Sequence, residues 1–215
     1  MNREYWRKGV EAFKEIHFKK HEKDFIEMVK KGQHPKALFI GCSDSRVVPS
    51  LITNTGPGEL FVMRNVGNFV PPYKPDNDFH ATAAAIEYAA FNLQVDEVIV
   101  CGHSDCGACK ALYKDHSAYA EEVPHTIKWL ELGMPAKVLA ERSVPDGDKA
   151  QLQEATEKFS VIFQLQNLLT YPNVRRRVME GTLFLHGWYY RLDTGEIEYF
   201  DPENQEFLPL IGEAE

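Results

Sequence analysis

Three short apolar runs constrain the fold of this chain most strongly, because none of them has a helical period and each stops at a polar loop. They are Ala37–Ile40, Leu60–Met63 and Glu97–Cys101. Runs of this length and composition predict strands that are buried on both faces of a parallel sheet. Between the last two runs lies Ala81–Leu93, an alanine-rich segment that favours a helix packed closely on the sheet. The alternation predicts an α/β fold with a mostly parallel central sheet flanked by helices.

Further patterns extend this fold toward both ends of the chain. Residues 1–31 are charged and carry apolar side chains at helical spacing, so we expect an N-terminal helical arm. Helices are also expected over Leu152–Leu169 and from Pro172 onward. Near the end, Leu183–Leu192 and Ile197–Phe200 flank the turn signal DTGE, which predicts an antiparallel edge hairpin. The 215 residues, 44% of them hydrophobic, suffice for one core and hence for a single domain.

The charge balance narrows the function. Asp and Glu number 32 against 24 Lys and Arg, a formal net charge of -8. We therefore expect no nucleic-acid partner and no anionic membrane, because either selects a basic face. The charged start, MNREYWRK, and the lack of about 18 consecutive apolar residues predict neither a signal peptide nor a membrane span. A cytoplasmic location is the resulting expectation. In that reducing compartment the four cysteines suit metal ligands, reactive thiols or packing better than a disulfide framework.

Three side chains that bind metals well follow the first and third apolar runs. Cys42 comes after the first run, and His103 and Cys106 come after the third. In an open α/β sheet, ligands bind beyond the carboxyl ends of strands at the switch point, so these side chains converge if the two strands are neighbours there. Zinc binds thiolate and imidazole ligands, and a catalytic site keeps its fourth position for water or substrate. The sequence therefore predicts one zinc ion on Cys42, His103 and Cys106.

Asp44 and Arg46 bear on whether this site is open. Two thiolates and a neutral imidazole make the zinc unit neutral, so we expect its water to ionise above the roughly neutral pKa of three-histidine sites. Asp44 is placed to take or to leave the fourth position, and Arg46 can hold its carboxylate through two hydrogen bonds. A closed structural site with Asp44 as the fourth ligand stays open as an alternative. The catalytic interpretation is favoured, because a structural site has no need of Arg46.

Two other classes of function compete with a zinc enzyme. Cys106 and Cys109 have the Cys-x-x-Cys spacing of a thiol oxidoreductase and lie at an expected helix start, where a thiolate is stabilised. That hypothesis leaves Cys42, Asp44 and His103 without a role. The second alternative is a zinc-stabilised binding module without turnover, and the presence of Asp44 argues against it.

Two stretches, Cys42–Arg46 (CSDSR) and Gly102–Gly107 (GHSDCG), together resemble the paired signature of the beta-class carbonic anhydrases. The resemblance extends through the stretches 57–62, 64–68, 71–73, 85–88 and 186–190. It covers most of the catalytic core that we expect at 32–200. A helical arm at 1–31 and a tail at 201–215 complete the single expected domain.

The resemblance implies the reversible hydration of carbon dioxide to bicarbonate and a proton, with zinc hydroxide as the nucleophile. It also implies that Asp44 binds zinc in an inactive state and pairs with Arg46 in the active state. Further residues match family positions that bind substrate or line its apolar pocket: Gln33, Phe61, Val66, Tyr88 and Gly107. In this family two subunits share the pocket, so a homodimer or a dimer of dimers is implied.

One position departs from the family pattern. A subgroup binds regulatory bicarbonate with a Trp, Arg and Tyr triad, and here Arg64 and Tyr190 match while Phe39 holds the Trp position. Phenylalanine has no indole donor, so we expect that inhibitory site to be absent or weakened. Related enzymes hydrolyse carbon disulfide or carbonyl sulfide on the same ligands, and this activity stays open as an alternative.

Overall fold

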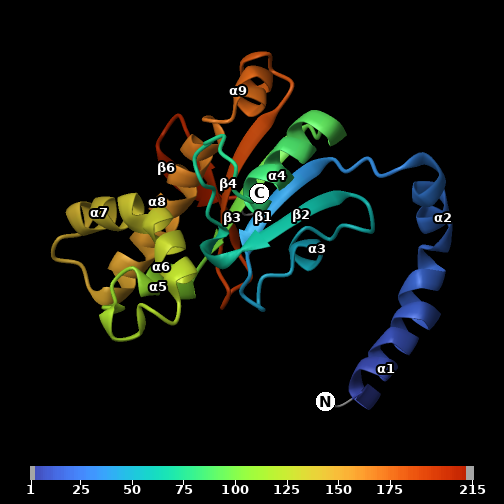
Figure 1. Cartoon of the computed structure of the whole chain (residues 1–215), viewed down its shortest axis with the longest axis horizontal. Helices are drawn as coiled ribbons and strands as arrows, with labels where there is room; N and C mark the ends of the chain where they lie inside the picture. Colours follow the sequence, from blue (N-terminus) through green and yellow to red (C-terminus); the bar gives the residue numbers. More distant parts are fainter. Residues whose placement is uncertain (1–2, 212–215) are drawn as a thin grey trace.

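The computed structural model describes residues 3–211, and within that part of the chain six strands form one sheet (Figure 1). Its strand order is β2-β1-β3-β4-β5-β6. The strands span Ala37–Cys42 (β1), Leu60–Asn65 (β2), Glu97–His103 (β3), Phe184–Tyr190 (β4), Ile197–Asp201 (β5) and Glu206–Pro209 (β6). The first four are parallel to one another, whereas β5 is antiparallel to β4 and β6 is antiparallel to β5, so the predicted sheet and hairpin are confirmed. Residues 1–2 and 212–215, the outer ends of the expected arm and tail, lie outside the described residues.

The strand order reverses at β1. One edge of β1 pairs with β2 and the other edge pairs with β3, all in parallel. The register matches Gly41 with Cys101, which brings the two strand ends, Cys42 and His103, to a similar level. A ligand site in an open sheet lies at such a switch point. The neighbour relation that the zinc prediction required is therefore confirmed.

Helices cover the sheet and connect its parallel strands. Those after β1 are α3 (Pro49–Ile52), η2 (Val66–Asn68), α4 (Ala81–Glu87), η3 (Tyr88–Leu93), α5 (Gly107–Ala111), η4 (Ser117–Tyr119), α6 (Pro124–Leu130), η5 (Glu131–Gly133), α7 (Met134–Ser143), α8 (Lys149–Leu168) and α9 (Pro172–Met179). α4 and η3 together form the helix expected over 81–93. α8 begins before the predicted start at Leu152, because the Asp148 carboxylate accepts hydrogen bonds from the N–H groups of Ala150 and Gln151 and so caps the helix.

Both faces of the central strands are buried. Leu38 on one face of β1 belongs to a cluster with Ile86 of α4 and Val161 of α8. Phe39 points to the opposite face, where Ile99 of β3 packs beside it. Burial on both faces explains why the sequences of these strands are continuously apolar rather than alternating between apolar and polar residues.

Two glycines let α8 lie directly against the sheet. A Cβ atom at Gly102 of β3 would lie 2.6 Å from Cγ2 of Val161, and one at Gly187 of β4 would lie 2.9 Å from Cγ1 of the same residue. Both distances are shorter than normal contacts between carbon atoms. The close approach brings Glu157, one turn before Val161, to the loop that follows β3.

The tail expected at 201–215 contributes a strand that the sequence did not predict. β6 pairs with β5 from Asp201 opposite Glu206 to Glu198 opposite Pro209. One edge of the sheet is therefore β6 and the other is β2, and the hairpin between β4 and β5 lies one strand in from β6.

The N-terminal arm extends away from the sheet (Figure 1). It consists of α1 (Arg3–Ala12), η1 (Phe13–Phe18) and α2 (Glu22–Lys31), with a break at His21. None of the residues of these three helices is buried, and the apolar side chains of Trp6 and Val29 are 65% and 87% exposed. Part of the apolar face of this arm is covered, because Met28 packs against Gly58, whereas the apolar side chains nearer its start are largely exposed.

Candidate metal centre and active site

The three predicted zinc ligands lie together at the carboxyl end of the sheet. Cys42 ends β1, His103 ends β3, and Cys106 directly precedes α5. Their ligand atoms all lie within 4.8 Å of one another, and the three residues are 5%, 1% and 2% exposed. This geometry suits one ion bound by two sulfurs and one imidazole nitrogen.

His103 presents one nitrogen to this cluster. Its Nδ1 lies 2.8 Å from the carbonyl oxygen of Ser104, which accepts the hydrogen bond. Its Nε2 is buried and has no hydrogen-bond partner among the described residues. A buried polar atom without a partner is costly, whereas a ring oriented by a hydrogen bond at Nδ1 is the usual arrangement of a histidine that binds a metal through Nε2. The residues present therefore fit a zinc ion.

The two thiols of the cluster are poor acids in the absence of a cation. The neighbouring Cys106 thiol and burial together raise the pKa of Cys42 to about 12. The pKa of Cys106 is raised as well, first by its contact with the Cys109 thiol and also by burial. A divalent cation favours the thiolate form and so replaces the protons of such thiols when it binds.

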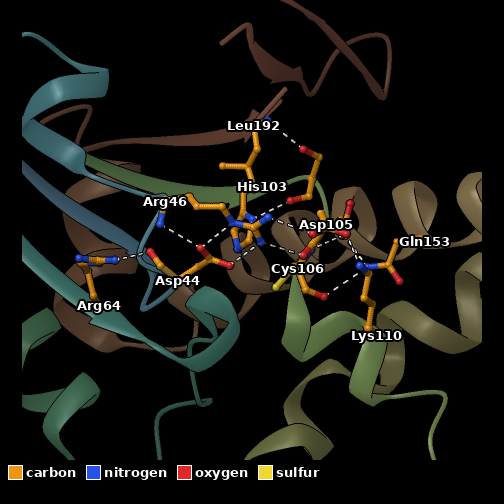
Figure 2. Close-up of polar contacts among 11 residues, drawn as sticks. Asp44, Arg46, Arg64, His103, Asp105, Cys106, Lys110, Gln153 and Leu192 are labelled. Atoms are coloured by element: carbon orange, nitrogen blue, oxygen red, sulfur yellow. Dashed lines mark hydrogen bonds and ion pairs between the residues drawn. The ribbon is translucent and has the colours of Figure 1, made fainter. Parts of the chain in front are cut away.

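Asp44 is held by Arg46 next to the cluster (Figure 2). Arg46 donates from Nε to Oδ1 of Asp44 at 2.9 Å and from Nη2 to Oδ2 at 2.8 Å. The backbone N–H of Arg46 donates to Oδ1 as well, at 3.0 Å. These hydrogen bonds hold the pKa of Asp44 well below its usual range, so the carboxyl group is ionised and engaged with Arg46.

Arg46 has a second acidic partner. Its Nη1 donates to Oδ2 of Asp105 at 3.0 Å, and Lys110 of α5 forms an ion pair with the other oxygen of Asp105. Arg46 is thus anchored on one side by Asp44 and on the other by Asp105 (Figure 2). Asp105 and Lys110 were not among the residues expected from the sequence.

Arg64 of β2 fixes the loop that follows β1. It donates from Nε to the Cys42 carbonyl at 2.9 Å and from Nη2 to the Asp44 carbonyl at 2.6 Å. Phe39, which holds the Trp position of the regulatory triad, is fully buried, and its ring meets that of Trp188 edge to face at a centroid distance of 6.3 Å.

Two of the substrate residues expected from the resemblance lie at the metal end of the sheet. Gly107 follows Cys106 as the first residue of α5, and a Cβ atom there would meet no other atom within 4 Å. Val66 follows the last residue of β2, which pairs with Cys42. Val66 is 47% exposed, and its carbonyl accepts a hydrogen bond from Nε1 of Trp129 at 2.7 Å.

The other three expected substrate residues lie toward the opposite end of the sheet. Phe61 is the second residue of β2, and its ring lies 5.7 Å from that of Tyr88, centroid to centroid. Gln33 is exposed and precedes the start of β1 at Ala37. The rise of about 3.3 Å per residue in a parallel strand separates Ala37 from Cys42 by about 16 Å. The chain therefore does not bring these residues to its own metal cluster.

A buried carboxylate lies behind the cluster, and the sequence analysis did not single it out. Glu157 of α8 is 2% exposed and accepts hydrogen bonds from the backbone N–H of Cys106 at 2.7 Å and from the Tyr189 hydroxyl at 2.9 Å. Burial raises its pKa. The sequence gives little indication of this role, because an acidic residue in a long helix of mixed polarity usually lies on the exposed face.

Known proteins resemble this chain over most of its length. A family model described as carbonic anhydrase matches residues 37–197. The carbonic anhydrase of Synechocystis sp. is 41% identical over 200 residues, which are 93% of this chain and 72% of that protein. The structure of the beta-carbonic anhydrase CcaA aligns with a TM-score of 0.88 at 38% identity and covers 98% of this chain and 92% of that chain. One of two tetrameric beta-carbonic anhydrases from Sordaria macrospora aligns at 0.79 with 27% identity, over 91% of this chain and 95% of its own.

The fold and the cluster define an α/β protein with a potential metal site at the switch point of its sheet. The chain belongs to the beta class of the carbonic anhydrases, which are lyases. The thiol oxidoreductase hypothesis is not favoured, because Cys106 converges with Cys42 and His103 in a group that could hold a metal ion. None of the helices within residues 3–211 is long and apolar enough to cross a membrane.

Proposed function

We propose that the chain binds one zinc ion on Cys42, His103 and Cys106 and catalyses the reversible hydration of carbon dioxide to bicarbonate and a proton. The observation that carries this proposal is the buried Nε2 of His103, which has no hydrogen-bond partner among the described residues, in a side chain whose ligand atom lies within 4.8 Å of two thiol sulfurs. Zinc is the metal that best suits two thiolates and one imidazole with a fourth position left over. Membership of the carbonic anhydrases supplies the reaction.

Zinc bound there would supply a Lewis acid that lowers the pKa of a water molecule far below that of free water, so that it can ionise and attack carbon dioxide. The chain's own groups do the rest. Asp44 is ionised and can accept a hydrogen bond from this water and orient it, while Arg46 holds its carboxylate off the metal. The N–H group of Gly107 lies in the first turn of α5, where it lacks a partner within the helix and can donate to the negative charge that develops on a substrate oxygen.

We propose that the substrate pocket is completed by a second copy of the chain in a homodimer. Gln33, Phe61 and Tyr88 lie too far along the sheet to reach the metal cluster of their own chain, and Tyr88 is 46% exposed. From a partner chain they can reach it and provide an amide donor and an apolar wall. The exposed apolar face of the arm offers area for the same contact, and the tetrameric relatives from Sordaria macrospora are compatible with a dimer of dimers.

The organisation of the chain is proposed to follow the sequence expectation. One domain would comprise a helical arm at 1–31 for contact between subunits, a catalytic core at 32–200 and a tail at 201–215. The protein would act in the cytoplasm, where four free cysteines stay reduced.

Metal analysis combined with a stopped-flow hydration assay tests the reaction. The wild-type protein should contain one zinc per chain and lose activity in the presence of a chelator. Cys42→Ser should lose both zinc and activity. Cys101→Ser is the matched control, because Cys101 is a buried cysteine of β3 outside the cluster, and it should keep both. A wild-type protein that hydrates carbon dioxide without bound zinc would overturn the proposal.

Mixing two inactive variants tests the shared pocket. Cys42→Ala removes a metal ligand, and Gln33→Ala removes a residue proposed to act on the partner's site. In a mixed dimer, one of the two sites combines an intact metal cluster with an intact Gln33. Mixtures exchanged through mild dissociation should therefore regain activity above that of either variant alone. Activity that never exceeds the average of the two would show that Gln33 serves its own chain.

A further inference from the structure

Glu157 lies behind the three metal-binding residues as a buried acidic side chain that the proposed chemistry does not use. It is 2% exposed, and one of its oxygens accepts hydrogen bonds from the backbone N–H of Cys106 and from the side-chain amide of Gln153. The other oxygen accepts from the Tyr189 hydroxyl at 2.9 Å. Burial of a carboxylate is expensive unless several donors compensate for it. Three donors from three different elements meet that condition here.

Helix α8 holds the backbone of Cys106 through hydrogen bonds to both its N–H group and its carbonyl group. Glu157 accepts from the N–H of Cys106 at 2.7 Å. Gln153, one turn earlier on the helix, donates to the carbonyl oxygen of Cys106 at 3.3 Å (Figure 2). Both contacts come from α8, whose position is fixed by its close packing on Gly102 and Gly187. The backbone that carries the Cys106 sulfur is thus tied to a rigid element rather than left in a free loop.

The other side of the metal-binding loop is tied to the end of β4. The N–H of Ser104 donates to the Tyr190 carbonyl at 2.9 Å, and the hydroxyl of Ser104 accepts from the N–H of Leu192 at 2.8 Å. His103 and Cys106 therefore belong to a segment held at both ends. β4 fixes the part near His103, and α8 fixes the part near Cys106.

We propose that Glu157, assisted by Gln153, is a positioning residue of the metal centre, whose carboxylate holds the Cys106 backbone so that the Cys106 sulfur stays in place for zinc. This inference rests on the proposed zinc site. Groups that hold metal ligands in place raise metal affinity. A ligand that moves freely loses conformational entropy when the ion binds, whereas a ligand already held in place does not. A hydrogen bond to a buried backbone amide is a restraint of this kind, because the amide has no water to take the place of its acceptor.

Three variants separate this role from a merely structural one. Glu157→Leu keeps the approximate volume but removes the acceptor for the Cys106 amide. Glu157→Gln restores an acceptor oxygen for that amide, and its new N–H group can donate to the Tyr189 hydroxyl. Glu154→Gln is the control, because Glu154 lies on the same helix but pairs with Lys158 and Arg191 instead.

Zinc affinity is measured by competition with a chromophoric chelator, and the stability of each metal-free chain by urea unfolding. Glu157→Leu should weaken zinc binding about 10–100-fold. Glu157→Gln should recover most of that loss, and Glu154→Gln should bind zinc as the wild type does. Equal losses in Glu157→Leu and Glu157→Gln would overturn the positioning role, because the charge rather than the hydrogen bond would then matter.

Two further outcomes keep the test decisive. If Glu157→Leu does not fold, Gln153→Leu, which removes the donor to the Cys106 carbonyl, should still weaken zinc binding severalfold, and unchanged affinity there would overturn the inference. A folded Glu157→Leu with wild-type zinc affinity would also overturn it while leaving the proposed function intact. A wild-type chain that binds no zinc would instead overturn the proposed function, before any variant is compared.

Discussion

Asp44 and Arg46 face each other so that the guanidinium donates to both oxygens of the carboxylate, at 2.9 and 2.8 Å. The two residues are separated by one position in the loop after β1, and the backbone N–H of Arg46 joins the same contact. A planar guanidinium and a planar carboxylate bonded in this way form one of the stronger pairs available to side chains. Asp44 is therefore held in one orientation beside the metal cluster.

Asp44→Ala should keep zinc and lose most of the turnover. The substitution removes no member of the converging cluster, so the zinc content measured by atomic absorption should match the wild type. It removes the carboxylate proposed to orient the attacking water by accepting its hydrogen bond, and the loss of a positioned acid–base group costs about 10²–10⁴-fold in rate. Stopped-flow hydration should show a loss of kcat in that range. Asp146→Ala, at an exposed position, is the control and should keep both values. Wild-type turnover in Asp44→Ala would show that Asp44 takes no part in the reaction.

Arg46→Ala should favour the closed state and move the rise of activity to higher pH. Without Arg46, the pKa of Asp44 returns toward its usual value of about 3.9, so the carboxyl group is still ionised at neutral pH. The substitution therefore does not protonate Asp44 but releases its carboxylate from Arg46. The released carboxylate competes with water for the metal, and hydroxide displaces it only at higher pH. Loss of the charge-assisted hydrogen bonds between Arg46 and Asp44 corresponds to a fall in kcat/KM of about 10–100-fold at neutral pH.

The pH profile of kcat/KM between about pH 6 and 9.5 measures this change. The wild-type activity should rise with pH, and the profile of Arg46→Ala should rise later and approach the wild type at the alkaline end. A profile that is flat with pH in the wild type, or a uniform loss in Arg46→Ala, would contradict gating by this pair.

Asp105→Asn should have a smaller effect than Arg46→Ala. Asp105 is the second partner of Arg46, at 3.0 Å, but the side chains of both residues are about half exposed, at 53% and 48%. Exposed ion pairs contribute about 0–1 kcal/mol, which corresponds to less than about a sixfold change in rate. Lys110→Met, which frees Asp105 from its other partner, should change the rate by less still. A loss in Asp105→Asn as large as that in Arg46→Ala would show that Asp105 itself has a role in the reaction.

Much of the fold and of the metal cluster could be predicted from the sequence, because both follow from local patterns. Apolar runs without a helical period marked β1 and β3, and their carboxyl ends carried Cys42 and His103. If the two strands pair in parallel, their carboxyl ends lie at the same edge of the sheet, and these two residues lie close together. β6 could not be predicted in the same way, because its four residues pack only after β5 has provided an edge.

The supporting contacts could not be predicted, because they depend on distances that the sequence does not encode locally. Glu157 is 51 positions from Cys106, and only the docking of α8 on the sheet brings them together. Gln33 is recognised by resemblance alone, because it is exposed, precedes β1 and lies far along the sheet from the metal ligands of its own chain.

Gly102→Ala should destabilise the fold because it separates α8 from the sheet. The added Cβ atom would lie 2.6 Å from Cγ2 of Val161, which must move. Such overpacking costs about 1–3 kcal/mol. Urea unfolding should show this loss, and the double variant with Val161→Ala should be less destabilised than the sum of the two single changes. Gly9→Ala is the control, because a Cβ atom at Gly9 in α1 would meet nothing within 4 Å and alanine favours a helix. Additive effects in the double variant would rule out the contact as the cause.

Tyr171→Phe should make the stability of the protein less sensitive to alkaline pH. Burial raises the pKa of Tyr171 to about 12, whereas an unfolded tyrosine has a pKa of about 10. Below pH 10 both states keep the proton, so the contribution of this group does not change. As the pH rises above that value the unfolded chain releases its proton first, and the wild type loses stability until the folded pKa is reached. At pH 8 the variant should be less stable by about 1 kcal/mol, because it lacks the hydrogen bond from the hydroxyl to the Pro71 carbonyl. Urea unfolding should therefore show that the difference in the free energy of unfolding between the wild type and the variant is smaller near pH 11 than at pH 8. A difference that stays constant would contradict the raised pKa.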